Sequence, residues 1–118
     1  MNYQDYGHFR RKYPRRAFKR GAGILYRGQF LISECIEIGE GGLSFSCGRE
    51  LTPNTLIVAS FRIPNGDFVS LRAEVRAARP SPQGGFIHGV AFTHIAFTHK
   101  RQIRSFVSER TERESVGM

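Results

Sequence analysis

The strongest constraint in this sequence is a series of short runs in which apolar and polar residues alternate. From residue 69 to residue 77 every odd-numbered residue is apolar and every even-numbered residue is polar or charged, and residues 43–47 follow the same rule. Residues 57–63 also place an apolar residue at every odd position. Because successive side chains of a strand point to opposite faces, this period of two predicts half-buried strands.

Turn signals separate these runs. Pro64-Asn65-Gly66-Asp67 lies between two of them, and Asn-Gly predicts a hairpin because both residues tolerate a positive φ. Further strands are predicted at 23–26 and 30–38, joined through Arg27-Gly28-Gln29, and at 86–93 after a loop at 80–85. Six strands with no helix between them are typical of a mainly β protein, either an antiparallel barrel or a sandwich.

The pattern changes near the end of the chain. Thr98 is a residue type that caps helices, and Ile103, Phe106 and Val107 recur at helical spacing. We therefore expect a helix from residue 98 whose apolar stripe packs on the rim of the β-structure.

Length and composition indicate one domain. The chain has 118 residues, enough for a single core. Cys35 and Cys47 have neither disulfide-framework nor zinc-ribbon spacing, so buried free thiols are expected. No apolar run approaches the ~20 residues of a membrane span, and residues 1–6 lack the apolar core of a secretory signal. The expected compartment is the cytoplasm.

Positive charge is concentrated near the start of the chain. The net charge is +8, and seven of the eleven residues from 10 to 20 are Arg or Lys. No acidic residue occurs between Asp5 and Glu34, so this segment should attract anions. The basic residues from Lys100 to Arg113 are instead interleaved with glutamates, as on a solvated helix surface.

Nothing in the sequence indicates catalysis. The four histidines, at positions 8, 88, 94 and 99, lack metal-ligand spacing, and there is neither a Gly-x-Ser-x-Gly elbow nor a cysteine beside an obvious base. His88 lies in a predicted strand, where a structural role is the better interpretation. We therefore expect a binding protein that uses no metal or cofactor, and not an enzyme.

The order of these features resembles the PilZ domain, a bacterial receptor module for cyclic di-GMP, over residues 9–112. Ligand-binding members of that family carry R-x-x-x-R, often preceded by another arginine. Arg11 and Arg15 match this motif, and Arg10 completes the doublet. The spacing Arg16–Arg20 also fits. The earlier register is preferred because the apolar Phe18 follows Arg15 as at the family's entry into its first strand.

The second family motif, D/N-x-S-x-x-G, is matched imperfectly. With Gly42 at its end, Glu37 stands where the family has Asp or Asn, and Gly39 stands where it has Ser. Glu37 carries its carboxylate one methylene further out, and Gly39 lacks a hydroxyl. Two lost hydrogen bonds at ~0.5–1.5 kcal/mol each would weaken binding by roughly ten- to a hundredfold.

The resemblance implies a six-stranded antiparallel, Greek-key-like β-barrel with a C-terminal α-helix. It implies a flexible basic arm at 1–21 carrying the R-x-x-x-R motif, a barrel at 22–97, and the helix and tail at 98–118. It also implies that the chain binds cyclic di-GMP and signals to a protein partner, such as flagellar, pilus or exopolysaccharide machinery. The expected ligand-binding residues are Arg10, Arg11, Arg15, Glu37, Gly39, Gly41 and Gly42.

The chemistry of these residue types suits that ligand. The planar fork of arginine binds phosphate oxygens in a bidentate manner and also fits the O6/N7 edge of guanine. Glycines at 41 and 42 let the backbone approach a ligand closely. We therefore expect the arm to fold over a ligand that rests on the barrel face.

Two other interpretations remain open. The departures at Glu37 and Gly39 favour a PilZ-like adaptor with a degenerate pocket, which acts through protein contacts alone. More distantly, the basic arm suits nucleic acid, but it lacks the array of exposed aromatic residues expected of surfaces that stack on single strands. The arginine motif favours the nucleotide receptor.

Overall fold

The computed structural model describes residues 13–116, with side chains described as far as residue 109. Six longer strands follow one another along this part of the chain: β2 (Gly21–Tyr26), β3 (Gln29–Gly39), β4 (Gly42–Cys47), β5 (Leu56–Arg62), β6 (Phe68–Pro80) and β7 (Phe86–His94). A short strand, β1 (Arg15–Ala17), precedes them, and a helix, α2 (Phe97–Val116), follows them.

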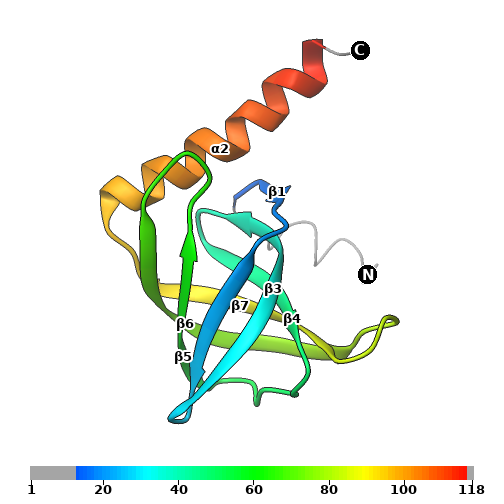
Figure 1. Cartoon of the computed structure of the whole chain (residues 1–118). Coiled ribbons are helices and arrows are strands. Elements are labelled where there is room, and N and C mark those ends of the chain that lie inside the picture. Colours follow the sequence, from blue (N-terminus) through cyan, green and yellow to red (C-terminus); the bar gives the residue numbers. More distant parts are fainter. Residues whose placement is uncertain (1–12, 117–118) are drawn as a thin grey trace, which may run out of the picture.

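The six longer strands close into an antiparallel barrel, as predicted (Figure 1). They are hydrogen-bonded in the order β3-β2-β5-β6-β7-β4, and β4 pairs back onto β3. The predicted Asn-Gly turn joins β5 to β6, and Asn65 has a φ of 59°. β1 was not predicted; it pairs antiparallel with the last residues of β3.

The apolar residues of the alternating runs fill the interior of the barrel. Ile24, Phe45 and Phe61 are at most 1% exposed, and burying each such side chain contributes ~1.5–3 kcal/mol. Cys35 and Cys47 are free and buried, as expected. Burial raises the pKa of the Cys35 thiol to about 12, so this thiol stays protonated and unreactive at neutral pH.

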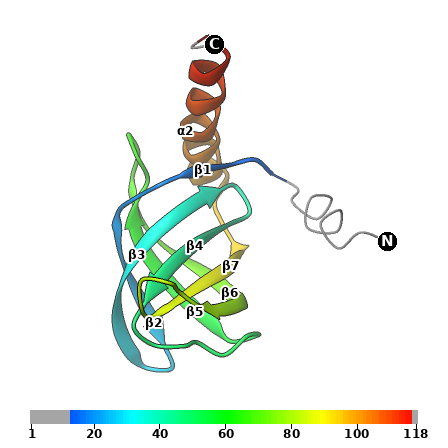
Figure 2. The same ribbon diagram turned by 90° about the vertical axis from the view of Figure 1, so that its right-hand side faces the viewer.

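Helix α2 lies across one end of the barrel (Figure 1 and Figure 2). Ile103 and Val107 are buried, and the ring of Phe106 meets that of Phe18 edge-on, with 6.0 Å between the ring centroids. The predicted apolar stripe is therefore confirmed, and it covers the barrel end.

The start of the helix differs from the prediction. The chain turns directly after β7, and the Lys100 N–H donates to the Ala96 carbonyl, so the helix begins at Phe97. Thr98 lies inside the first turn, and its assignment as the cap was wrong. No helix in residues 13–116 is long and apolar enough to cross a membrane.

β1 runs between the barrel and α2 (Figure 2). Arg16 is directed to the helix, where its Nη1 donates to the Phe106 carbonyl at 2.9 Å and lies 3.5 Å from the Glu109 carboxylate. A second tie joins the turn after β3 to the helix, because Arg104 donates twice to the carboxylate of Glu40, at 3.0 and 3.1 Å. These contacts fix β1, and with it the neighbouring Arg15, against the barrel.

Candidate functional site

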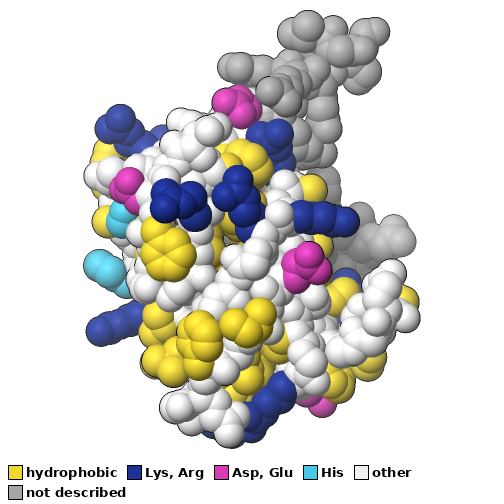
Figure 3. Space-filling view, in the orientation of Figure 1, with side chains coloured by type: hydrophobic (Ala, Val, Ile, Leu, Met, Phe, Trp, Pro, Cys, Tyr) yellow, Lys and Arg dark blue, Asp and Glu magenta, His cyan; other side chains and the backbone are white. Residues whose placement is uncertain are grey.

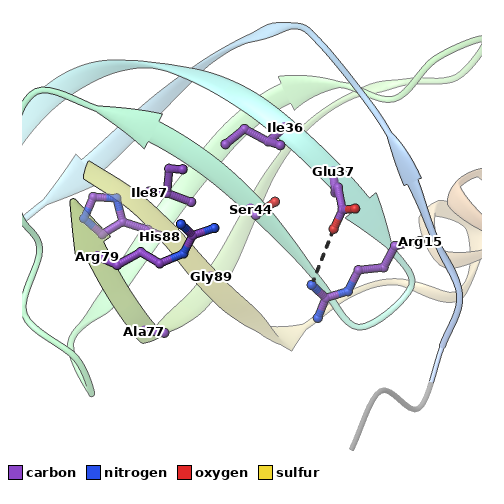
Figure 4. Close-up of a pocket in the computed structure, with 9 residues that line it drawn as sticks. All are labelled: Arg15, Ile36, Glu37, Ser44, Ala77, Arg79, Ile87, His88 and Gly89. Atoms are coloured by element: carbon purple, nitrogen blue, oxygen red, sulfur yellow. Dashed lines mark ion pairs between the residues drawn. The ribbon is translucent and has the colours of Figure 1, made fainter. Parts of the chain in front are cut away.

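A pocket of about 360 Å³ opens on the outer wall of the barrel (Figure 4). It lies where the second half of β3, strand β4, the end of β6 and the start of β7 run side by side. Its lining combines five polar side chains with apolar and small residues: Arg15, Glu37, Ser44, Arg79 and His88, with Ile36, Ala77, Ile87 and Gly89.

Two β-bulges shape this pocket. The pairing of β3 with β4 shifts register between Cys35 and Glu37, and the pairing of β6 with β7 shifts between Val75 and Ala77. The inward–outward alternation breaks at both places, since Ile36 and Glu37 are both partly exposed and residues 76 and 77 are both exposed. A bulge re-aims side chains and increases the local twist. These two bulges bring β3 and β6 side chains to the walls of one hollow.

Arg15 reaches the pocket because β1 pairs with the end of β3. Arg15 lies opposite Gly39, and Ala17 lies opposite Glu37. The close approach requires glycine at position 39, because a Cβ there would stand 2.7 Å from the Pro14 carbonyl oxygen. Arg15 is thereby held at one end of the pocket.

Arg15 and Glu37 form a long ion pair at one end of the pocket. Arg15 Nη1 lies 3.9 Å from Glu37 Oε1, and the two side chains are 36% and 39% exposed. An ion pair this long and this exposed contributes little, so an anion can compete for the guanidinium. Arg79 is exposed at the other end of the pocket and has no carboxylate partner among residues 13–109.

His88 forms part of the pocket floor and has a structural role, as its position in the sequence suggested. It is fully buried, stacks on Phe45 with 5.2 Å between ring centroids, and its Nε2 accepts a 2.9 Å hydrogen bond from the Leu51 N–H. Burial lowers the pKa of His88, against a smaller opposing effect of Glu50. The ring is therefore neutral at pH 7, with its proton on Nδ1.

The chemistry of the pocket suits an anionic ligand with polar heterocycles. Two guanidinium groups can bind phosphate or a purine edge, and a hydroxyl and a carboxylate offer further hydrogen bonds. Among the side chains that the structure describes, residues 13–109, there is no group of three or more His, Cys, Asp or Glu that could hold a metal ion.

Of the residues predicted as ligand contacts, Arg15 and Glu37 come together in the pocket. Gly39, Gly41 and Gly42 lie beside it, outside its lining. Each of these glycines has a packing neighbour: Gly39 faces Pro14, Gly41 faces the Tyr13 ring, and a Cβ on Gly42 would overlap the Val90 carbonyl oxygen. Arg10 and Arg11 lie outside the described residues. Arg16, the start of the alternative motif register, contacts α2 instead of the pocket.

The motifs did not indicate Ser44 or Arg79. Ser44 could have been predicted from the sequence, because the alternation of Leu43 and Phe45 places it on the outer face. In the structure it pairs with Glu37 across the β3–β4 ladder. Arg79 depends on the bulge in β6, which has no signature in the sequence.

Comparisons with known proteins identify the family of the chain. Residues 9–109 match the family model of the PilZ domain, while a search of curated proteins by sequence found no match. Among solved structures, one similar fold is that of Bacillus subtilis Inhibitor of motility (MotI/DgrA), with a TM-score of 0.77 and 16% identity, covering 86% of this chain and 51% of that protein.

Two further similar structures come from Escherichia coli. The PilZ domain of YcgR with c-di-GMP has a TM-score of 0.70 and 13% identity, covering 92% of this chain and 98% of that one. YcgR in complex with c-di-GMP has a TM-score of 0.62 and 17% identity, covering 92% of this chain and 50% of that one. The chain thus spans about half the length of MotI/DgrA and YcgR. At these identities the likeness is one of fold, and together with the family match it shows that this chain belongs to the PilZ domain family.

Proposed function

We propose that this chain is a cytoplasmic receptor for cyclic di-GMP, which binds the nucleotide in the pocket on the outer barrel wall and signals to a protein partner. One observation carries the proposal. β1 holds Arg15, a residue of the family motif, at a polar pocket that has a second guanidinium, Arg79, at its other end.

The chemistry of the ligand matches this arrangement. Cyclic di-GMP has two phosphates and two guanines, so it offers both anionic oxygens and purine edges. Arg15 binds a phosphate or the O6/N7 edge of a guanine, and Arg79 binds a second such group. The Glu37 carboxylate accepts from the ring N–H and amino group of guanine, and the Ser44 hydroxyl adds a hydrogen bond.

The remaining predicted contacts complete the proposed site. Arg10 and Arg11 precede β1 by a few residues, so they can reach over a ligand that Arg15 already contacts. The glycines at 39, 41 and 42 lie beside the pocket, and any contact that they make with the nucleotide is through their backbone groups, since their Cβ positions face Pro14, Tyr13 and Val90.

The relatives support the ligand and the kind of output. Two of the similar structures are described as complexes with c-di-GMP, and a third protein is an inhibitor of motility. A partner in the flagellar machinery is therefore the first choice, ahead of pilus or exopolysaccharide machinery.

Calorimetric titration with cyclic di-GMP in ~0.15 M salt, where charges are screened over ~8 Å, tests the proposal. We expect saturable binding, weakened at least about tenfold in Arg15→Ala and in Arg79→Ala. Arg62→Ala is the matched control, because Arg62 lies at the end of β5, outside the lining of the pocket, and its side chain donates to the Gly66 carbonyl in the neighbouring turn. GMP and a short single-stranded DNA serve as competing anions. Equal heats from all three ligands, fading as salt rises, would contradict the proposal.

A second candidate function is supported by one specific contact. The Pro14 carbonyl occupies the space that a side chain at position 39 would need, where the family motif has serine. β1 therefore takes the place of one expected ligand contact, which favours an adaptor that works without nucleotide. No heat from cyclic di-GMP with the folded protein would select this function.

A further inference from the structure

We infer that the barrel wall opposite the pocket is a docking face for a protein partner that presents apolar side chains flanked by carboxylates. The inference rests on the proposed function in requiring a protein partner. It does not require that the pocket bind nucleotide.

Exposed apolar side chains gather on this wall. Among the described residues six large hydrophobic side chains are exposed, and four of them lie here: Leu25 at 45%, Phe30 at 65%, Ile32 at 75% and Leu56 at 63%. Figure 3 shows hydrophobic side chains clustered over the lower part of the barrel. A contiguous apolar area on a folded domain indicates an interaction site more often than single exposed residues do.

The strand register makes these residues neighbours. Leu25 on β2 lies opposite Phe30 on β3 and opposite Val58 on β5, and Gly23 lies opposite Ile32. Their side chains therefore share the outer face of three adjacent strands. We call the set of Leu25, Phe30, Ile32 and Leu56 the apolar face.

The apolar face has a hollow that can take an anchoring side chain. A pocket of about 290 Å³ opens between Leu25, Leu56 and Val58, with Arg27 and Arg72 at its rim. Interfaces draw most of their binding energy from a few apolar or aromatic anchors seated in such hollows.

Phe30 is held in place before any partner arrives. Its ring lies across β2 over Gly23, so closely that a Cβ on Gly23 would overlap the ring. Glycine inside a strand weakens it, and here it provides the seat for an exposed aromatic ring. An aromatic side chain that is already ordered loses little conformational entropy on binding.

The charges around the apolar face indicate which charge the partner's surface carries. Neither Arg27 nor Arg72 has a carboxylate partner among residues 13–109. Of the two acids at the margins, Glu74 already pairs with Arg76 at 3.1 Å, and Glu34 lies on β3 beyond Ile32. The rim is positive overall, which favours carboxylates on the partner.

The same charges disfavour a second copy of this chain. A two-fold contact places the same patch on both subunits, so the Arg27 and Arg72 rims would face each other. Like charges at an interface are repulsive. A different protein, apolar at its centre and acidic at its edge, fits this surface better.

Peptide selection tests the inference with a defined probe. A phage-displayed library of random peptides is selected on the wild-type protein and depleted on Phe30→Ser/Ile32→Ser. We expect enriched peptides that combine aromatic or aliphatic residues with Asp or Glu. Enrichment of basic peptides, or no enrichment, would overturn the inference.

The best peptide is then synthesised with a fluorescent label and titrated by anisotropy. We expect its affinity to fall about tenfold or more in Ile32→Ser and Leu56→Ser, and severalfold in Arg72→Glu. Gly23→Ala, which displaces the Phe30 ring while keeping it exposed, should also weaken binding. Unchanged affinity in all four variants would overturn the inference, as would a dimer in sedimentation equilibrium that Ile32→Ser dissociates.

The design separates this inference from the proposed function. Arg15→Ala and saturating cyclic di-GMP should leave peptide binding intact, and Ile32→Ser should leave the calorimetric response to nucleotide intact. Circular dichroism confirms that each variant is folded. A failure of nucleotide binding alone therefore leaves the docking face standing, and a failure of peptide binding alone leaves the pocket standing.

Discussion

The pocket and the apolar face lie on opposite walls of the same barrel, and they differ in both backbone and chemistry. The ladders under the apolar face, β3–β2, β2–β5 and β5–β6, run without a register shift. Of the ladders around the pocket, β3–β4 contains one register shift and β6–β7 contains two. The hollow over the regular ladders is lined mainly by apolar side chains, which suits an anchoring side chain of a protein, whereas the hollow at the bulged ladders is lined by several charged side chains, which suits a small anionic molecule. Strand β3 belongs to both regions, with its first half in one and its second half in the other.

The largest expected difference is between two phenylalanines, one under the pocket and one on the apolar face. Phe45 is fully buried beneath the pocket, so Phe45→Ala should lower the free energy of unfolding by about 3–5 kcal/mol. Phe30 is 65% exposed, and Phe30→Ala should change it by less than about 0.5 kcal/mol. Urea denaturation measures both. A comparable loss in the two variants would mean that Phe30 is part of the core.

The next difference concerns two glycines. Gly42→Ala forces a methyl group against the Val90 carbonyl in the β4–β7 ladder, and it should cost about 1–3 kcal/mol. Gly48 has no atom within 4 Å of an added Cβ, so Gly48→Ala serves as the control and should be close to neutral. The stabilities of the two variants are compared by their midpoints of thermal unfolding. If Gly42→Ala were as stable as the control, the packing of β4 on β7 described above would be wrong.

A third comparison concerns nucleotide binding by variants of two glutamates, one on each half of β3. If Glu37 accepts hydrogen bonds from guanine, Glu37→Gln should weaken cyclic di-GMP binding by about tenfold. Glu34→Gln, on the half beside the apolar face, should have no effect. Calorimetry distinguishes the outcomes. A rise in affinity for Glu37→Gln would show that the carboxylate only competes with phosphate for Arg15.

The smallest expected effect is on pH dependence. Burial lowers the pKa of His88 below its ordinary value of about 6.5. As pH falls below that value, the unfolded chain takes up a proton before the folded one, so the free energy of unfolding decreases. His88→Gln keeps an acceptor for the Leu51 N–H but does not titrate. Its stability profile between pH 7 and pH 5 should be flatter than that of the wild type, and an equal slope would exclude His88 as the cause.

Local patterns were sufficient to predict the barrel. The alternation of residues 69–77 and the Asn65-Gly66 turn each specify a strand or hairpin without help from distant residues. β1 could not be predicted in this way, because it has only three residues and its position depends on Gly39, far along the chain.

Which side chains of a strand point into the barrel was harder to predict than where the strand lies in the sequence. In the first half of β3 the polar Ser33 is inside, where its hydroxyl donates to the Ala22 carbonyl at 3.0 Å, while Phe30 and Ile32 are outside. This reverses the usual order, and the register of the β2–β3 hairpin sets it. The pocket was found only in part for a related reason: Arg15 and Glu37 are in the family motifs, but the bulge that places Arg79 beside them depends on pairing between β6 and β7.

The most direct test is a map of cyclic di-GMP binding by nuclear magnetic resonance. Amide shifts in uniformly ¹⁵N-labelled protein are followed during titration, in the wild type and in Arg15→Ala. We predict saturable shifts at Arg15, Glu37, Ser44 and Arg79, none at Leu25, Phe30 or Ile32, and a much weaker response in the variant. Shifts confined to the apolar face, or a response that Arg15→Ala leaves unchanged, would contradict the assignment of the pocket as the nucleotide site.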